Sequence, residues 1–113
     1  MTKVEKKIND LTEALKRAVL AAQELKDTED GGTCNFDSPK LFLDGWSRKS
    51  IETACKAAGL VCFDHKLFLK DKVGWVICGG TSGQGNRRTR MAERMAESLT
   101  NDGYTCYMYY QAD

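Results

Sequence analysis

The chain contains one histidine, one proline and no long apolar run in its 113 residues. Because His65 is its only histidine, it lacks the residues for a metal site built on a histidine pair or for a two-histidine phosphodiesterase mechanism. No segment approaches the roughly 20 apolar residues that span a bilayer. Met1 also leads directly into charged residues rather than into an apolar signal region. We therefore expect a cytoplasmic protein that does not engage a membrane.

The five cysteines are an odd number, and none of them belongs to a Cys-x-x-Cys pair, a pattern that disfavours a zinc site. Four of them lie in apolar surroundings, as in Val61-Cys62-Phe63, where a reduced cysteine behaves as a small apolar side chain. Thiols stay reduced in the cytosol. We therefore expect buried free thiols, no metal and no cofactor.

The charge of the chain is nearly balanced. Its 17 basic and 16 acidic side chains give a formal net charge of +1. This balance argues against a protein whose main task is to coat nucleic acid. At this length, and with 42% apolar residues, residues 1–113 are expected to form one domain with a modest core.

A long amphipathic helix is predicted for residues 3–26. Apolar residues recur at steps of three or four from Val4 to Leu25, and residues 27–32 follow as a terminating turn. We assign residues 1–27 to this helix and residues 33–113 to an α+β core. The apolar stripe is longer than a small domain needs. It is therefore expected either to pack against another copy of the chain or to cover the sheet.

The core is expected to alternate strands and helices. Strands are predicted at residues 33–43, 60–66, 73–78 and 104–110, and helices at residues 47–58 and 86–100. Ser47 is a typical helix N-cap and Gly59 a typical terminator. Pro39 cannot donate to a strand ladder, so it indicates a bent or edge strand. The order β-α-β-β-α-β predicts an α+β, ferredoxin-like domain in which both helices cover one face of an antiparallel sheet.

The segment from Gly79 to Arg90 places a glycine-rich turn before an arginine-rich helix. Backbone N–H groups at such a helix start can face a phosphate. The Walker pattern fits badly, because Asn86-Arg87 stand where lysine and a hydroxyl residue are required. The dinucleotide fingerprint fails because Arg88 replaces its third glycine. The segment therefore predicts a site for a phosphorylated small molecule, the alternative being a flexible loop with solvated arginines.

Helical spacing supports the anion site. Arg87, Arg90 and Arg94 fall at positions i, i+3 and i+7 and share one flank of the predicted helix. Their like charges repel by roughly a few tenths of a kcal/mol unless a ligand compensates them. Glu93 and Glu97 can offset part of this repulsion.

A second polar cluster lies between Asp30 and Ser38, where hydroxyl, amide, carboxylate and aromatic groups surround two glycines. Strand alternation places Thr33, Asn35 and Asp37 on one polar face. This mixture suits a site that grips a ribose and stacks a base. The alternative is a helix-to-strand turn whose polar side chains bond to local backbone.

Three motifs of the chain resemble one known family. They are Asp30-Gly31-Gly32-Thr33-Cys34-Asn35-Phe36-Asp37-Ser38, then Gly83-Gln84-Gly85-Asn86-Arg87-Arg88-Thr89 with Met91-Ala92-Glu93, and the closing Tyr109-Tyr110-Gln111. In combination they resemble the phage-encoded Thoeris anti-defence sponge proteins of the first type. The similarity spans most of the domain, and the first helix carries no part of it.

The resemblance implies a non-catalytic protein for immune evasion in the cytoplasm of an infected host cell. Such a protein sequesters the cyclic ADP-ribose isomers that TIR enzymes of Thoeris defence produce, so that the downstream effector is not activated. Some members of the family also bind cyclic oligonucleotides of CBASS immunity and assemble as hexamers. The resemblance therefore also implies a homo-oligomer, a dimer or a hexamer.

Residue roles follow from position within these motifs. The arginines Arg87, Arg90 and Arg94 are assigned to phosphate, and Arg88 is counted with them. Gln84 and Asn86 are assigned to phosphate or ribose, and Phe36 or Trp75 to stacking on the base. The polar strand face of Thr33, Asn35 and Asp37 is expected to contact ribose hydroxyls or to brace the arginines.

Three other functions fit parts of the sequence. A small nucleic-acid-binding module is the leading alternative, because Trp75 on a central strand, flanked by arginines, is suited to stacking single-stranded bases. A cyclic-nucleotide hydrolase would have Glu93 and Asp37 as its candidate bases, but the sequence assembles no metal cluster, histidine pair or nucleophile, so we expect a protein without catalytic activity. A pure interaction protein that acts through the first helix would tolerate loss of the arginines.

Overall fold

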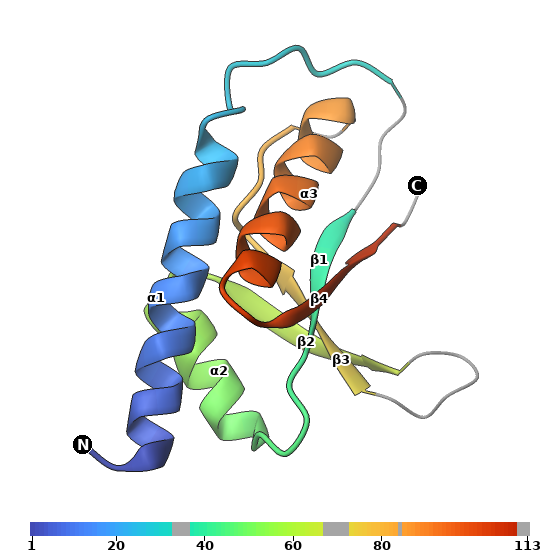
Figure 1. The fold of residues 1–113 in the computed structure, drawn as a ribbon. Helices are drawn as coiled ribbons and strands as arrows, with labels where there is room; N and C mark the ends of the chain where they lie inside the picture. The colour runs from blue at the N-terminus through green and yellow to red at the C-terminus, as the bar shows by residue number, and fades with distance from the viewer. Residues whose placement is uncertain (33–36, 67–72, 84, 111–113) are drawn as a thin grey trace.

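The computed structural model describes residues 1–32, 37–66, 73–83 and 85–110 as an α+β structure. Within these residues three helices accompany a four-stranded antiparallel sheet (Figure 1). In chain order the elements are α1 (Lys3–Gln23), β1 (Ser38–Phe42), α2 (Arg48–Ala57), β2 (Val61–Lys66), β3 (Val73–Cys78), α3 (Asn86–Asn101) and β4 (Thr105–Tyr109). Among the described residues, no helix has the length and apolar character needed to span a membrane.

Helix α1 begins with a reciprocal cap and ends earlier than expected. The Thr2 hydroxyl accepts a hydrogen bond from the Glu5 amide, and the Glu5 carboxylate accepts one from the Thr2 amide. This capping box satisfies two backbone donors that the first turn leaves open. The helix ends at Gln23, and isolated hydrogen-bonded turns follow it. The expected end at Lys26 was therefore about three residues too late.

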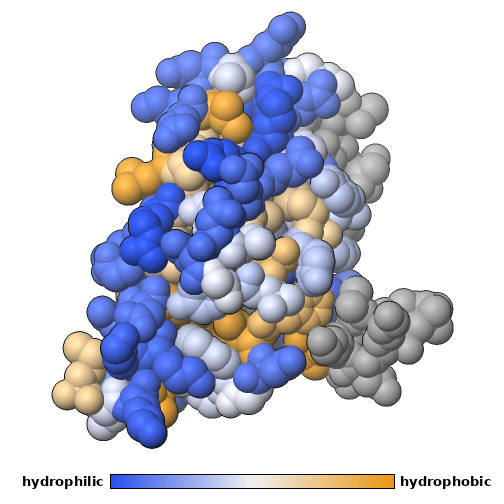
Figure 2. All heavy atoms as spheres, viewed as in Figure 1, coloured by the Kyte–Doolittle hydropathy of each residue, from blue (hydrophilic) through white to orange (hydrophobic). Residues whose placement is uncertain are grey.

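The apolar stripe of α1 is buried within its own chain. Leu11, Leu15 and Ala18 are fully buried, and the helix packs against α3 and α2. Figure 1 shows α1 running alongside α3 and over α2. The buried part of the stripe therefore packs against α2 and α3 of the same chain, while Val4 at its start is 56% exposed. The outward surface of α1 is mainly hydrophilic in Figure 2.

The sheet has the order β2-β3-β1-β4, and every neighbouring pair is antiparallel. Of the two alternatives predicted from Pro39, a bent strand or an edge strand, the edge position was wrong, because β1 lies between β3 and β4. Paired positions toward β3 begin at Lys40, so Pro39 precedes that ladder, although it stands opposite Met108 on β4. The missing N–H of proline is tolerated where one of the two ladders has not yet begun.

The elements after β1 are confirmed within a residue or two at their ends. The first strand, predicted for residues 33–43, spans Ser38–Phe42, and residues 33–36 lie outside the described residues. Ser47 caps α2 by accepting from the Ser50 amide, and Gly59 follows the helix with a φ of +78°. Strands β2 and β3 cover the predicted ranges. The predicted connection around Lys70-Asp71-Lys72 lies outside the described residues.

The two faces of the sheet differ in what covers them. Leu41, Trp75 and Ile77 belong to the buried cluster that includes the helix residues. Side chains alternate along a strand, so Lys40 and Val76 point to the opposite face. No helix covers that face in the described part of the chain, and we call it the open face of the sheet.

Candidate functional site

The two motifs that the sequence separates by some fifty residues meet at the start of α3. The Asp30 carboxylate accepts hydrogen bonds from the Gly85 amide at 3.0 Å and from the Arg87 amide at 3.2 Å. The Asn86 amide donates to the Gly31 carbonyl at 2.8 Å. Three N–H groups that we expected to face a phosphate are therefore satisfied by the chain itself, with a carboxylate at the anion position.

The glycines of the turn are explained by this contact. A Cβ on Gly85 would collide with the Gly31 carbonyl oxygen. At Gly83 the φ of +86° is one that side chains rarely adopt, and a Cβ there would lie 2.7 Å from the Asp30 carboxylate. Glycine is therefore required here for the close approach of two backbone segments, whether or not a ligand is bound.

The arginine flank is folded against the chain that precedes β1. Arg90 donates to the Glu29 carbonyl at 2.6 Å and to the Thr28 hydroxyl at 3.2 Å, while Arg87 reaches the Thr28 carbonyl at 3.4 Å. The Arg87 Nε is buried and has no hydrogen-bond partner among the described residues. Arg94, one turn further along, pairs with Glu97 at 3.0 Å, as the spacing suggested.

Arg88 and Thr89 connect α3 to the beginning of β1. The Arg88 guanidinium donates to the Asp37 carbonyl at 3.2 Å and to the Ser38 hydroxyl at 3.3 Å. The Thr89 hydroxyl donates to the Asp37 carboxylate at 2.7 Å. Because Asp37 is almost fully buried, this carboxylate holds the strand to the helix and is not exposed to a ligand or a water nucleophile.

The remaining predicted residues say less about the site. Thr33, Asn35, Phe36 and Gln84 lie outside the described residues. Asn86 is exposed at the first position of α3, and its side chain lies over Gly32. The described part of the cluster therefore consists of Asp30, Asp37 and residues 83–90 without Gln84.

Trp75 does not belong to this cluster, and its assignment to base stacking needs correction. Its side chain is 7% exposed and belongs to the main core. The Arg48 guanidinium lies 5.0 Å from the centre of its ring. The ring is thus enclosed on the helix-facing side of the sheet, where a base cannot reach it.

Sequence reasoning missed Lys40, which lies at the centre of the open face. The residue is only 3% exposed, and its ammonium donates to His65 Nδ1 at 2.7 Å. The Lys40 ammonium lies 5.6 Å from the centre of the Phe42 ring and 5.8 Å from that of Tyr109. The His65 ring packs edge-on against the Tyr109 ring. Burial lowers the pKa of this lysine. The only signal in the sequence was its position two residues before Phe42, which places both side chains on the same face of the strand.

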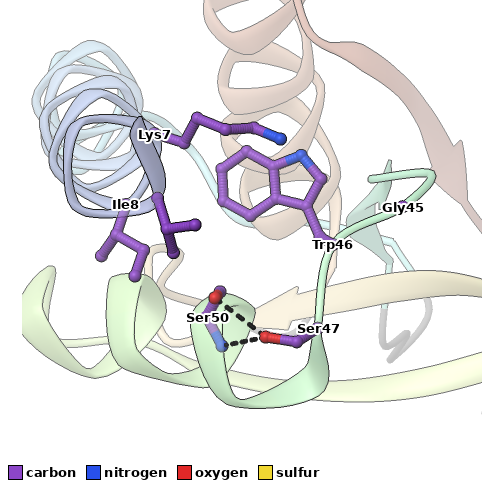
Figure 3. Close-up of a pocket in the computed structure, with 7 residues that line it drawn as sticks. Lys7, Ile8, Gly45, Trp46, Ser47 and Ser50 are labelled. Atoms are coloured by element: carbon purple, nitrogen blue, oxygen red, sulfur yellow. Dashed lines mark hydrogen bonds between the residues drawn. The ribbon is translucent and has the colours of Figure 1, made fainter. Parts of the chain in front are cut away.

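A separate hollow lies between α1 and the turn before α2. It is lined by Ile8, Gly45, Ser47 and Ser50, with Lys7 lying over the Trp46 indole at 4.9 Å (Figure 3). Its volume of about 180 Å³ is below the roughly 300 Å³ at which small-molecule pockets begin. It is also remote from the cluster at α3, so we assign no ligand to it.

The cysteines in the described residues are free, as expected for Cys55, Cys62, Cys78 and Cys106. Burial raises the pKa of the Cys55 and Cys106 thiols, so these groups stay protonated and unreactive at neutral pH. Within the same residues no group of three or more histidine, cysteine, aspartate or glutamate side chains could hold a metal ion.

The cluster at the start of α3 thus combines guanidinium groups with backbone segments held in close contact. Arg90 is exposed and Arg94 partly so, and each guanidinium has five N–H donors, more than its observed contacts use. Such an arrangement can bind anions by charge-assisted hydrogen bonds. No protein-family model, curated protein or solved structure matches the chain.

Proposed function

We propose that this protein binds and sequesters cyclic nucleotide immune signals, with cyclic ADP-ribose isomers as the primary class, and does not cleave them. One observation carries the proposal: the described parts of the two distinctive motifs, residues 28–32 and 37–38 on one side and 85–90 on the other, lie against each other through Asp30, Arg88 and Thr89. A ligand with a pyrophosphate, two riboses and a purine needs this mixture of cations, amides and hydroxyls at one place.

In the proposed mode, Arg90 and Arg94 contact the phosphates. Both lie on the accessible flank of α3, and both keep donors beyond those used within the chain. Asp30 sets the position of the helix start. Thr33, Asn35 and Phe36, which lie outside the described residues, keep their sequence-based assignment to ribose and base contacts. An anion that approaches the first turn competes with the Asp30 carboxylate for the same amides.

Two finer features belong to the same proposal. The strand order β2-β3-β1-β4 and the alternation of strands and helices after α1 support a ferredoxin-like domain. We also propose that the protein acts in the cytoplasm of the infected cell as a dimer or hexamer. Because α1 buries its stripe internally, such an assembly would use a surface other than that stripe.

The proposal is tested by titrating cyclic ADP-ribose isomers into the protein in a calorimeter, then denaturing the complex and recovering the ligand. Tight binding followed by release of intact ligand is the expected result. Converted ligand would identify an enzyme instead, and absence of binding to any isomer would remove the proposed function.

The arginines provide the matched variants. Changing both Arg90→Ala and Arg94→Ala should weaken binding by several kcal/mol, because a hydrogen bond to a charged group contributes roughly 1.5 to 3 kcal/mol. Arg17→Ala is the control, since Arg17 lies on α1 and pairs with Asp102 at 3.1 Å. The double variant should stay folded by circular dichroism. Unchanged affinity in it would show that these arginines do not bind the phosphates.

A further inference from the structure

The open face of the sheet carries exposed aromatic rings on both of its edge strands. Backbone register defines one row across the four strands through Phe63, Val76, Lys40 and Tyr107. Phe63 is 47% exposed at one end of the row, and Tyr107 is 64% exposed at the other. The half-buried Phe42 ring packs edge-on against Tyr107 at 5.9 Å and widens that end.

Among the described side chains, the charge of this face has one sign. Lys40 lies in the middle of the row, and the described side chains that point to this face include no carboxylate. Asp64, the acidic residue of β2, stands opposite Trp75 and so points to the other face, where it pairs with Arg48 at 2.8 Å. A partner that fits the open face therefore offers flat apolar surfaces together with negative charge.

We propose that the open face binds single-stranded nucleic acid, with one base stacked on Phe63 and another on Tyr107 and the intervening backbone in the field of Lys40. Base stacking on aromatic side chains tolerates any sequence because every base has a flat face. This surface is separate from the cluster at α3 and adds a second binding activity to the proposed function.

The spacing of the rings selects single strands over duplexes. Strands lie about 4.8 Å apart, so the two ends of a row across four strands are separated by about 14 Å. Stacked neighbouring bases are separated by only about 3.4 Å. Bases must therefore be unstacked and splayed to reach both rings, which a single strand permits and a paired duplex resists.

A second copy of the chain fits this face less well. In a symmetric dimer the same patch meets itself, so a contact centred on this row would bring the two Lys40 ammonium groups toward each other. Like charges that face each other away from water repel strongly. A polyanion with aromatic bases meets the same face without this penalty.

Fluorescence anisotropy with a labelled ten-nucleotide oligodeoxythymidine tests the proposal directly. We expect saturable binding at low salt, with a logarithmic salt slope no steeper than about −0.7, because Lys40 is the one cation among the described side chains of this face and is itself only 3% exposed. Phe63→Ala and Tyr107→Ala should each weaken binding roughly ten-fold, given the usual effect of deleting one stacking ring. Val61→Ala on the same edge strand and Leu20→Ala on α1 are matched controls, since both residues are exposed and apolar but carry no ring.

Three results would overturn the proposal: no binding by the unaltered protein, equal binding by the ring variants and the controls, or equal affinity for a duplex of the same length. Sedimentation that shows dimers disrupted by the ring variants would assign the face to a second copy instead. The calorimetric titration with cyclic ADP-ribose isomers is independent of this test. The ring variants should retain that binding, so failure of one proposal is distinguishable from failure of the other.

Discussion

Asp30 explains why the segment after Gly79 is rich in glycine. Its carboxylate occupies the position that an anion takes at a helix start, and the turn must approach it closely to donate from Gly85 and Arg87. A carboxylate at a helix N-terminus stabilises the helix in the same way as a phosphate would. The motif therefore has a structural role in the free protein, in addition to any role in binding.

At the residue scale, we expect Gly85→Ala to destabilise the fold. The added methyl group would collide with the Gly31 carbonyl oxygen, and relief of the clash would break the contacts of Asp30 with the turn. A loss of roughly 1–3 kcal/mol is typical of such overpacking. Urea denaturation measures it.

The neighbouring glycine gives the control for this prediction. A methyl group added at Gly31 would meet no atom within 4 Å, so Gly31→Ala should change the free energy of unfolding by less than about 0.5 kcal/mol. Equal stability of the two variants would contradict the close approach described at Gly85.

At the element scale, α1 is part of the core and not an appended arm. Its buried side chains belong to the same cluster as Leu41 and Trp75 of the sheet. Helix α3 packs against α1 on one side and against β1 and β4 on the other, so it transmits the position of α1 to the strands. Loss of packing in α1 should therefore lower the stability of the whole domain.

We expect Leu15→Ala to lower the free energy of unfolding by about 2–5 kcal/mol, because the side chain is fully buried and its loss leaves a cavity. Leu20→Ala is the matched change on the same helix, and its leucine is 69% exposed. That variant should remain within about 0.5 kcal/mol of the unaltered protein. A mild effect of Leu15→Ala in chemical denaturation, or a large effect of Leu20→Ala, would indicate that α1 buries a different face.

At the scale of the whole molecule, buried titratable groups make the fold sensitive to alkaline pH. Burial raises the pKa of the Cys106 thiol from 9.0 to about 12 and also raises that of Cys55. Between pH 9 and 12 the unfolded chain ionises these thiols while the folded chain keeps their protons, so stability falls as pH rises. Lys40 acts in the opposite sense below 10.5, because its lowered pKa makes the folded state release its proton first.

Burial also raises the pKa of the Cys62 thiol, so three thiols oppose the single amine of Lys40, and we expect the urea midpoint to fall steadily above pH 9. Cys106→Ala removes one of these thiols and should make the decline shallower without changing its direction. Denaturation series at pH 8, 9 and 10 compare the two proteins. A midpoint that rises over this range would show that Lys40 dominates.

The sequence by itself determined the elements of this protein. Helical periodicity identified α1 and α3, the Ser47 cap and Gly59 bounded α2, and the apolar runs gave β2 and β3. These signals are local, because propensity, capping and turn chemistry act within a few residues. The sequence also marked both segments of the candidate site, since unusual glycine and arginine clusters stand out without a structure.

Only the tertiary structure decided which groups meet. In the folded chain Asp30 lies at the start of α3, Trp75 is enclosed beneath Arg48, and Pro39 belongs to a central strand. Folding also buries Lys40 under rings from strands that are distant along the chain. Contacts of this kind depend on strand order and on how helices pack over the sheet, and many residues far apart along the chain set both together. For that reason the partners of a charged side chain cannot be read from its own neighbourhood in the sequence.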